Sequence, residues 1–175
     1  MIENLIRSIL VKLHIISPPE IRMVELLRKK GVVIGENVHI YGSSVDGNYG
    51  GCIKIGNNVT ITGACILAHD ASTKKALGYT KVGRVHIGNN VFIGYGSVIL
   101  PETFIGDNVI VGAGSIVRGK VDSDSVVVGN PAKKVCSYSE YIDKNRQLLN
   151  EGYICEKGIT SEVIAMMDEK RIFVE

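Results

Sequence analysis

The chain of 175 residues is long enough for one principal domain with appended helices. Its 20 Lys and Arg residues against 18 Asp and Glu residues give a net charge of +2, which excludes nucleic-acid binding driven by overall charge. The four cysteines form no C-x-x-C pair or other short spacing, so we predict neither a disulfide framework nor a zinc knuckle and expect a cytoplasmic protein.

Segment 1–31 is predicted to contain helices. Apolar residues at 2, 5, 6, 9, 10 and 13 form an amphipathic stripe, and three charged residues interrupt it, so it is neither a signal peptide nor a membrane span. The stripe over 2–13 could lie on a membrane surface, but it has few basic residues, and packing against the next helix or another subunit is favoured. Ser17-Pro-Pro-Glu20 is a capping-box pattern for that helix, and Gly31 is a typical end for it.

A repeat of six residues occupies segment 32–136. A helix requires apolar residues at steps of three and four and a strand at every second residue, so this period indicates neither alone. Stacked short strands that share one core explain it, and we predict a parallel β-helix in which the first and fifth residues of each hexad point inward. The first positions are Ile34, Ile40, Ile55, Ile61, Leu67, Ile87, Ile93, Ile99, Ile105, Val111 and Val117. The fifth positions are Val38, Ser44, Val59, Cys65, Val91, Ser97, Thr103, Val109, Ser115 and Val121.

Gly and Asn recur at two other positions of the hexad. The second position is often Gly, and the fourth is Asn or Gly in six hexads. Both residue types tolerate a positive φ, which predicts turns between the short strands.

Two insertions interrupt the repeat. The first contains residues 45–51, and the second is the loop 69–86. Polar insertions that leave a rigid solenoid are where a functional site is expected.

The C-terminal tail, 137–175, is predicted to be helical. Ser137-x-x-Glu140 has the form of a capping box, and a further helix is expected at about 161–170.

The run from Ile87 to Val135, with its closing G-N-P-A, resembles the hexapeptide-repeat acyltransferases. Within them it is most similar to galactoside and maltose O-acetyltransferases and to O-acetyltransferases of bacterial surface-polysaccharide clusters, and the resemblance covers about 31–136. It implies an all-β dominated fold, a left-handed parallel β-helix with flanking N- and C-terminal α-helices. It also implies a homotrimer with active sites between subunits, acetyl-CoA as co-substrate and a sugar or glycan as acceptor.

His69 is the candidate catalytic base. The resemblance implies a histidine just before the long loop, and His69 precedes Ile87 by eighteen residues. The chemistry independently requires a base for the acceptor hydroxyl, and imidazole titrates nearest neutral pH. Asp70 or a backbone carbonyl could fix its tautomer. We expect His39 and His86, at outward hexad positions, to have no role in catalysis.

The resemblance also implies residues that hold the cofactor. Ala113 would contact it through the backbone, while Arg118, Lys133 and Lys134 would bind phosphates, for which guanidinium and ammonium groups are suited. Tyr95 is a further candidate because it replaces a small hydroxylated residue that touches the cofactor in the galactoside enzymes.

Acceptor candidates lie in the first insertion. They are Asp46, Asn48 and Tyr49, although such residues are also common in tight turns. Two departures from the family pattern concern the site: Glu102 replaces a frequent Gly after the proline, and Cys136 replaces a basic residue.

The main hypothesis is an acetyl-CoA-dependent O-acetyltransferase that acts on a sugar hydroxyl by direct transfer. N-acetylation of an amino-sugar nucleotide would use the same base. A metal hydratase of the γ-carbonic-anhydrase type is a remote alternative, since it requires three converging histidines, and no metal site is predicted. A non-catalytic trimeric scaffold is the remaining alternative.

Overall fold

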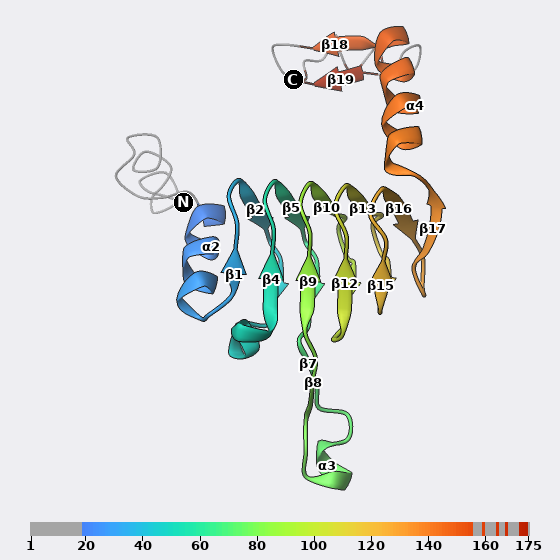
Figure 1. Cartoon of the computed structure of the whole chain (residues 1–175). Coiled ribbons are helices and arrows are strands. Elements are labelled where there is room, and N and C mark those ends of the chain that lie inside the picture. The colour runs from blue at the N-terminus through green and yellow to red at the C-terminus, as the bar shows by residue number, and fades with distance from the viewer. Residues whose placement is uncertain (1–18, 156–158, 160–163, 165–166, 168–171, 175) are drawn as a thin grey trace. The chain divides into compact units, whose positions relative to one another are not determined.

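Three β-sheets of mostly parallel strands form the faces of a prism in the first part of the chain (Figure 1). The computed structural model describes residues 19–155, 159, 164, 167 and 172–174. The chain divides into two units, 1–135 and 136–175, and each is described by itself.

Each sheet contains one short strand from successive coils of the chain. Sheet A has the order β1 (Val33–Ile34), β4 (Ile53–Ile55), β9 (Val85–Ile87), β12 (Thr103–Ile105) and β15 (Lys120–Val121). Sheet B has the order β17 (Lys133–Cys136), β16 (Ser125–Val128), β13 (Val109–Val111), β10 (Val91–Ile93), β5 (Val59–Thr62) and β2 (Val38–Tyr41). Sheet C has the order β14 (Ile116–Val117), β11 (Val98–Ile99), β6 (Cys65–Ile66) and β3 (Ser44–Val45). The chain passes from A to B to C and back to A, and we name the three edges A–B, B–C and C–A.

The path of the chain is left-handed. In Figure 1 the strands of sheet A rise on the near side, the chain returns behind them, and successive coils advance from left to right. This confirms the predicted left-handed parallel β-helix.

Aliphatic side chains stacked in register fill the prism. Ile61, Ile93 and Val111 are neighbours on adjacent strands of sheet B, and each is fully buried. Ile87 and Ile105 repeat this arrangement in sheet A, so the first positions of these hexads point inward as predicted.

Small hydroxyl residues also lie in the core. Ser97, Thr103 and Ser115 are fully buried at fifth hexad positions. The hydroxyls of Ser97 and Ser115 donate to the carbonyl of Gly112 at 3.0 and 2.6 Å, and that of Thr103 donates to the carbonyl of Leu100 at 2.6 Å. These bonds satisfy hydroxyl groups that would otherwise be buried without a partner.

The inward positions predicted at Ser44, Cys65 and Leu67 are wrong. Ser44 is exposed, and Cys65 and Leu67 are half-buried. The residues that point into the core are each one position earlier: Ser43, Ala64 and Ile66 are buried.

A shorter corner explains this shift. At the B–C edge, Gly42 and Gly63 adopt positive φ values of 56° and 52° at the third position of their hexads. In the regular coils the corresponding residue is at the fourth position, as at Gly96 with φ 72°. The two short corners therefore contain one residue fewer, and the frame after them moves by one.

Asparagines form a ladder along the A–B edge. Asn37, Asn58, Asn90 and Asn108 have φ values between 53° and 55°, which confirms the predicted turns at the fourth position. Each amide Nδ2 donates to the Oδ1 of the next asparagine at 3.0 Å. The second-position glycines instead allow close stacking, since a Cβ on Gly56 would lie 2.5 Å from the carbonyl oxygen of Gly88.

Helix α2 (Pro19–Lys29) covers the first coil. Val24 and Leu27 are buried, and the Arg28 guanidinium donates to the carbonyls of Ile34 and Gly35 at 3.1 and 2.6 Å. The predicted N-terminal helix is thus present, while the stripe over 2–13 lies outside the described residues. No helix in the described part of the chain is both long and apolar enough to cross a membrane.

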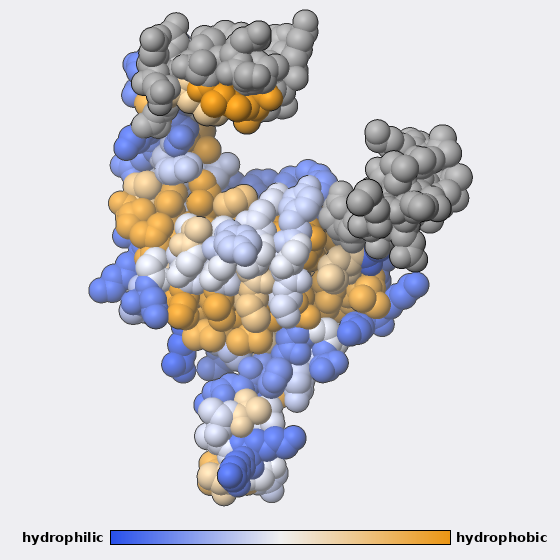
Figure 2. All heavy atoms as spheres, turned by 180° about the vertical axis from the view of Figure 1, so that it is seen from behind, coloured by the Kyte–Doolittle hydropathy of each residue, from blue (hydrophilic) through white to orange (hydrophobic). Residues whose placement is uncertain are grey.

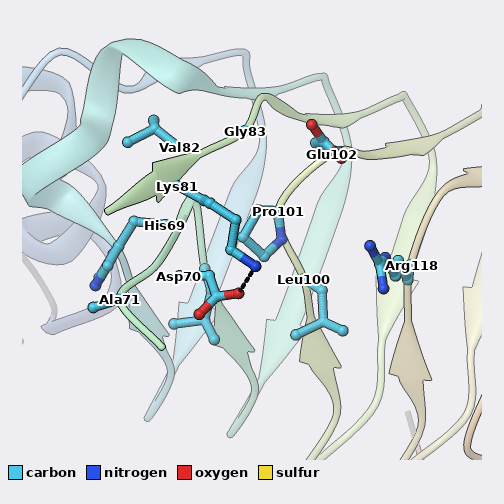
Figure 3. Close-up of a pocket in the computed structure, with 11 residues that line it drawn as sticks. His69, Asp70, Ala71, Lys81, Val82, Gly83, Leu100, Pro101, Glu102 and Arg118 are labelled. Atoms are coloured by element: carbon cyan, nitrogen blue, oxygen red, sulfur yellow. Dashed lines mark ion pairs between the residues drawn. The ribbon is translucent and has the colours of Figure 1, made fainter. Parts of the chain in front are cut away.

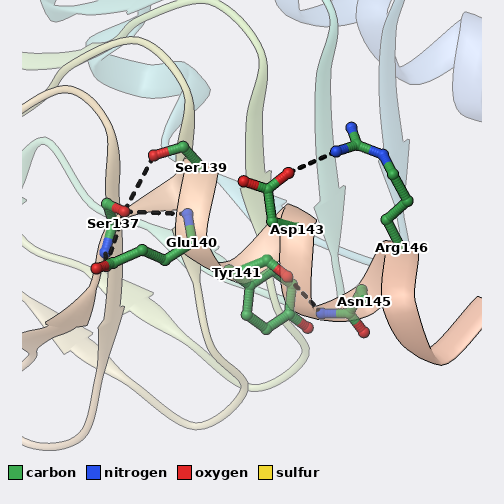
Figure 4. Close-up of polar contacts among 7 residues, drawn as sticks. All are labelled: Ser137, Ser139, Glu140, Tyr141, Asp143, Asn145 and Arg146. Atoms are coloured by element: carbon green, nitrogen blue, oxygen red, sulfur yellow. Dashed lines mark hydrogen bonds and ion pairs between the residues drawn. The ribbon is translucent and has the colours of Figure 1, made fainter.

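Helix α4 (Tyr138–Glu151) dominates the second unit. Its capping box is as predicted: the Glu140 N–H donates to Ser137 Oγ at 3.1 Å, and the Ser137 N–H donates to Glu140 Oε2 at 2.8 Å (Figure 4). The tail also contains a parallel pair of strands that the sequence did not predict, β18 (Tyr153–Cys155) and β19 (Ile172–Val174). Most of the further helix predicted at about 161–170 lies outside the described residues.

Candidate functional site

Both insertions leave the prism at the C–A edge. The first folds into the 3₁₀ turn η1 (Gly47–Cys52). The second forms an arm, defined here as residues 69–84, in which β7 (His69–Asp70) pairs with β8 (Lys81–Val82) and the short helix α3 (Lys74–Leu77) lies at the tip. The arm projects away from the body of the prism (Figure 1). The base of the arm, at the ends of β7 and β8, lies beside the C–A corners of the next two coils, at residues 100–102 and 118.

His69 meets Asp46 at the base of the arm. The pairing of Val45 with Ile66 places the residues that follow β3 and β6 side by side. The Asp46 carboxylate accepts a hydrogen bond from His69 Nδ1 and another from the N–H of Ala68 at 3.2 Å. Because a carboxylate only accepts, this contact places the proton of the neutral imidazole on Nδ1 and leaves Nε2 without one.

The two members of this pair differ in exposure. The Asp46 side chain is 6% exposed and that of His69 is 34% exposed. The carboxylate is therefore held within the protein while the imidazole reaches solvent.

Tyr49 packs against the imidazole. Its ring centroid lies 4.8 Å from that of His69, with the two planes tilted by 30°. Aromatic contacts of this kind fix a ring plane as well as bury surface. Asn48, the third acceptor candidate, is exposed and does not line the pocket beside His69.

A pocket of about 620 Å³ opens beside His69 at the C–A edge (Figure 3). Its walls come from the arm and from the corners of the next two coils. Leu67, Val82, Leu100 and Pro101 supply apolar surface, and His69, Asp70, Lys81, Glu102 and Arg118 supply polar groups.

Asp70 pairs with Lys81 across the arm. The Lys81 Nζ lies 2.6 Å from Asp70 Oδ2, and the Ser72 N–H donates to Asp70 Oδ1 at 2.8 Å. Lys81 first, and then Ser72, lowers the pKa of Asp70 well below its usual range. Asp70 therefore stays ionised at neutral pH and bonds within the arm, while Asp46 bonds to the imidazole.

Only one predicted cofactor residue lines this pocket. Arg118, at the corner after β14, faces it. Ala113 and Tyr95 lie exposed at the B–C edge, where the Tyr95 ring covers Gly63 of the previous coil. Lys133 and Lys134 lie on β17, and Lys134 Nζ donates to the carbonyl of Asp124 at 2.8 Å. A single chain thus does not bring these five residues together.

The other described histidines lie elsewhere. His39 bonds Asn37 through Nε2 at 3.0 Å and stacks on Tyr41, and His86 is exposed on sheet A. Among the described residues, no group of three or more His, Cys, Asp or Glu side chains could hold a metal ion.

The partner of His69 is the residue that the sequence did not identify as such. Asp46 was a candidate only for the acceptor, because 23 residues separate it from His69. The positions of the two insertions could have predicted this pair. Asp46 lies at the start of the first insertion, and His69 lies at the start of the second insertion, one coil later at the same edge.

The repeat region is similar in sequence to known proteins. The family profile described as bacterial transferase hexapeptide (six repeats) matches residues 79–119. Protein CapG of Staphylococcus aureus is 45% identical over 125 residues, which cover 67% of this chain and 73% of CapG.

Solved structures show the same architecture. A maltose O-acetyltransferase from Clostridium difficile 630 is 28% identical, with a TM-score of 0.50, over 70% of this chain and 78% of that chain. A galactoside acetyltransferase in complex with coenzyme A is 24% identical, with a TM-score of 0.54, over 78% of this chain and 80% of that chain. At 24% identity, the similarity to the galactoside acetyltransferase shows a shared fold and nothing about activity.

Proposed function

Because this chain belongs to the hexapeptide-repeat acyltransferase family, we propose that it is an acetyl-CoA-dependent O-acetyltransferase acting on a sugar or glycan hydroxyl. The observation that carries the proposal is the His69 imidazole, which borders a pocket and is held through Nδ1 by the buried carboxylate of Asp46. The 28% identical maltose O-acetyltransferase supports the choice of a sugar hydroxyl.

His69 is the general base of the proposed reaction. Its Nε2 takes the proton of the acceptor hydroxyl while that oxygen attacks the thioester carbonyl. The tetrahedral intermediate then collapses, the C–S bond breaks, and the imidazolium returns the proton to the leaving thiolate. The products are an acetyl ester and free CoA, with no covalent enzyme intermediate. Asp46 stabilises the imidazolium that forms and keeps the correct tautomer.

Acetyl-CoA is the proposed acyl donor. The galactoside acetyltransferase of similar fold was solved with coenzyme A, and Arg118 gives this pocket an exposed guanidinium. We assign Ala113 and Tyr95 to contacts with the donor, and Lys133 and Lys134 to its phosphates, where positive side chains suit the negative charge.

A homotrimer would complete the site. Arg118 and His69 lie at the C–A edge and Ala113 at the B–C edge of one chain, so the C–A edge of one subunit must face the B–C edge of its neighbour to join them. The outer face of sheet C supports such contact, since Val98 and Ile116 point outward there and are apolar.

The proposed compartment is the cytoplasm. Cys52, Cys65 and Cys136 are free thiols, a state that a reducing compartment maintains.

A thiol-release assay tests the proposed function. The purified protein is given acetyl-CoA with a panel of galactosides, maltose, amino-sugar nucleotides and streptogramins, and released CoA is measured with a thiol reagent. We expect acceptor-dependent release and an O-acetylated sugar by mass spectrometry. His69→Ala should lower kcat by about 100-fold or more, because a positioned base typically contributes that much.

His86→Ala is the matched control, because His86 is an exposed histidine of the same solenoid outside the pocket. It should keep the activity of the parent enzyme. Unchanged turnover in His69→Ala would overturn the assignment of His69 as the base. Acetylation of amines and of no hydroxyl would overturn the proposal that the acceptor group is a hydroxyl.

A further inference from the structure

Glu102 has an unusual backbone conformation for its residue type. Its φ is +63°, in the left-handed region that L-residues avoid for steric reasons. Asn and Asp tolerate this region because their short side chains bond locally, whereas a glutamate gains no such compensation. The other described non-glycine residues with positive φ are all of the tolerant types: Asn37, Asn58, Asn90, Asn108 and Asp124.

The strained residue lies in the wall of the pocket beside His69 (Figure 3). Glu102 forms the corner between β11 and β12, next to the returning strand of the arm. A Cβ on Gly83 would lie 2.6 Å from Glu102 Cγ and 2.7 Å from the Glu102 backbone nitrogen, so the glycine lets the arm approach this corner closely. The corner that carries the glutamate therefore packs directly against the arm.

The carboxylates around the pocket differ in what they already bind. Asp46 is bonded to the imidazole, and Asp70 is bonded to Lys81 and Ser72. No hydrogen bond or ion pair joins the Glu102 carboxylate to any residue in the part of the chain that the structure describes. Of the two carboxylates that line the pocket, Asp70 and Glu102, Glu102 therefore keeps both oxygens unpaired for a ligand.

We propose that Glu102 determines acceptor specificity by accepting hydrogen bonds from one or two hydroxyls of the sugar that occupies the pocket. This inference rests on the proposed function. A carboxylate has two oxygens that accept, and hydrogen bonds to a charged group are stronger than neutral ones. The preferred acceptor is then a neutral sugar with vicinal hydroxyls, because an anionic group at this place would meet the negative charge.

Backbone strain separates this role from a structural one. Glycine adopts φ +63° without the steric cost, so a glutamate kept only for folding would be improved by replacement. Glu102→Gly should therefore raise Tm by about 2 to 4 °C, as expected for removal of one strained residue from a chain of this length. The same change should weaken acceptor binding.

The experiment compares the parent with Glu102→Gly and Glu102→Gln, using methyl β-D-galactopyranoside and maltose as probes. For Glu102→Gly we expect the KM of the sugar to rise about 10- to 100-fold, which matches the loss of a hydrogen bond to a charged group. The KM of acetyl-CoA and the kcat at saturating sugar should stay close to the parent values. Glu102→Gln keeps the shape and the strain, so it should raise the sugar KM less and leave Tm unchanged.

Calorimetric titration of each sugar without acetyl-CoA separates the two proposals. Transfer by Glu102→Gly with an unchanged sugar KM would reject the role of Glu102 and leave the proposed function standing. In a second outcome, the parent binds the sugar but does not acetylate it, and Glu102→Gly no longer binds the sugar. This would reject the proposed function and leave Glu102 as a sugar ligand. A parent that neither binds nor acetylates either sugar would reject both.

Discussion

The contact between Asp46 and His69 fixes the orientation of the imidazole. Asp46 holds Nδ1 and is itself held by the N–H of Ala68, so it cannot turn away without losing two hydrogen bonds. Tyr49 restricts the ring plane from the side. The free nitrogen, Nε2, is then the one that can take a proton from a ligand.

Asp46→Asn is expected to lower kcat by about 100-fold while the protein stays folded. The amide oxygen of Asn can still accept from Ala68, so the turn is preserved. The amide oxygen in the place of Oδ2 also keeps the bond from Nδ1, but the amide has no charge to stabilise the imidazolium that the proposed reaction forms. Steady-state kinetics and circular dichroism of the variant check both parts.

Asp122→Asn is the control for this prediction, because Asp122 pairs with Lys120 at 2.6 Å on the surface, away from the His69 pocket. It should keep parental kcat. Equal activity of Asp46→Asn and the parent would show that the carboxylate does not act through His69.

The sequence predicts which histidine borders a pocket, but it does not predict which residue bonds to the imidazole of that histidine. His69 stood out because it opens an insertion, and the structure places it in the pocket wall. Its partner depends on which residues become neighbours on adjacent coils, and this depends on corner lengths that the period alone does not give. Glu102 was visible only as a departure from a glycine; its φ and its place beside Gly83 required coordinates.

The corners of the prism determine how the coils stack, and the wrong predictions of inward-pointing residues all follow from two of these corners. The period of six predicts sheets, inward aliphatics and the turns at asparagine, because these repeat identically in most coils. It fails at the two short corners, where Gly42 and Gly63 turn the chain one residue early. A glycine at the third position was the signal for this, but Ser44 and Cys65 were equally small and fitted the regular frame.

Asn58→Ala tests how much one rung of the asparagine ladder contributes. Asn58 accepts from Asn37 and donates to Asn90, and it holds φ at 55°. Ala loses both hydrogen bonds and must adopt the left-handed conformation, so we expect the free energy of unfolding to fall by about 2 to 4 kcal/mol. Urea unfolding at one fixed protein concentration measures it, since assembly affects apparent stability.

Asn58→Gly is the matched variant for this position. Glycine loses the same hydrogen bonds without the steric cost, so its loss should be about 1 to 2 kcal/mol. Equal losses in the two variants would show that the backbone conformation contributes nothing to the difference. A negligible loss in both would mean that exposed asparagine ladders do not stabilise the coils.

For the first unit as a whole, the candidate residues are divided between edges of the prism. His69 and Arg118 belong to the C–A edge, whereas Ala113 and Tyr95 belong to the B–C edge. Apolar side chains gather on the face turned away from sheet A (Figure 2). Contact between copies through such a face would bring the two kinds of edge together, which is why the proposed site requires a second subunit.

Complementation between two inactive variants tests this shared site. His69→Ala removes the base at one edge, and Ala113→Trp places a bulky ring on an exposed residue at the other, so each variant alone should be inactive. In trimers formed by co-expression of the two, about a quarter of the clefts combine an intact C–A edge with an intact B–C edge. Thiol release should then return to about a quarter of the parental rate, while separately purified variants mixed after assembly should stay inactive. Co-expressed variants that remain inactive as intact trimers would show that each chain holds a complete site, because only a site built from two chains can be restored by exchange.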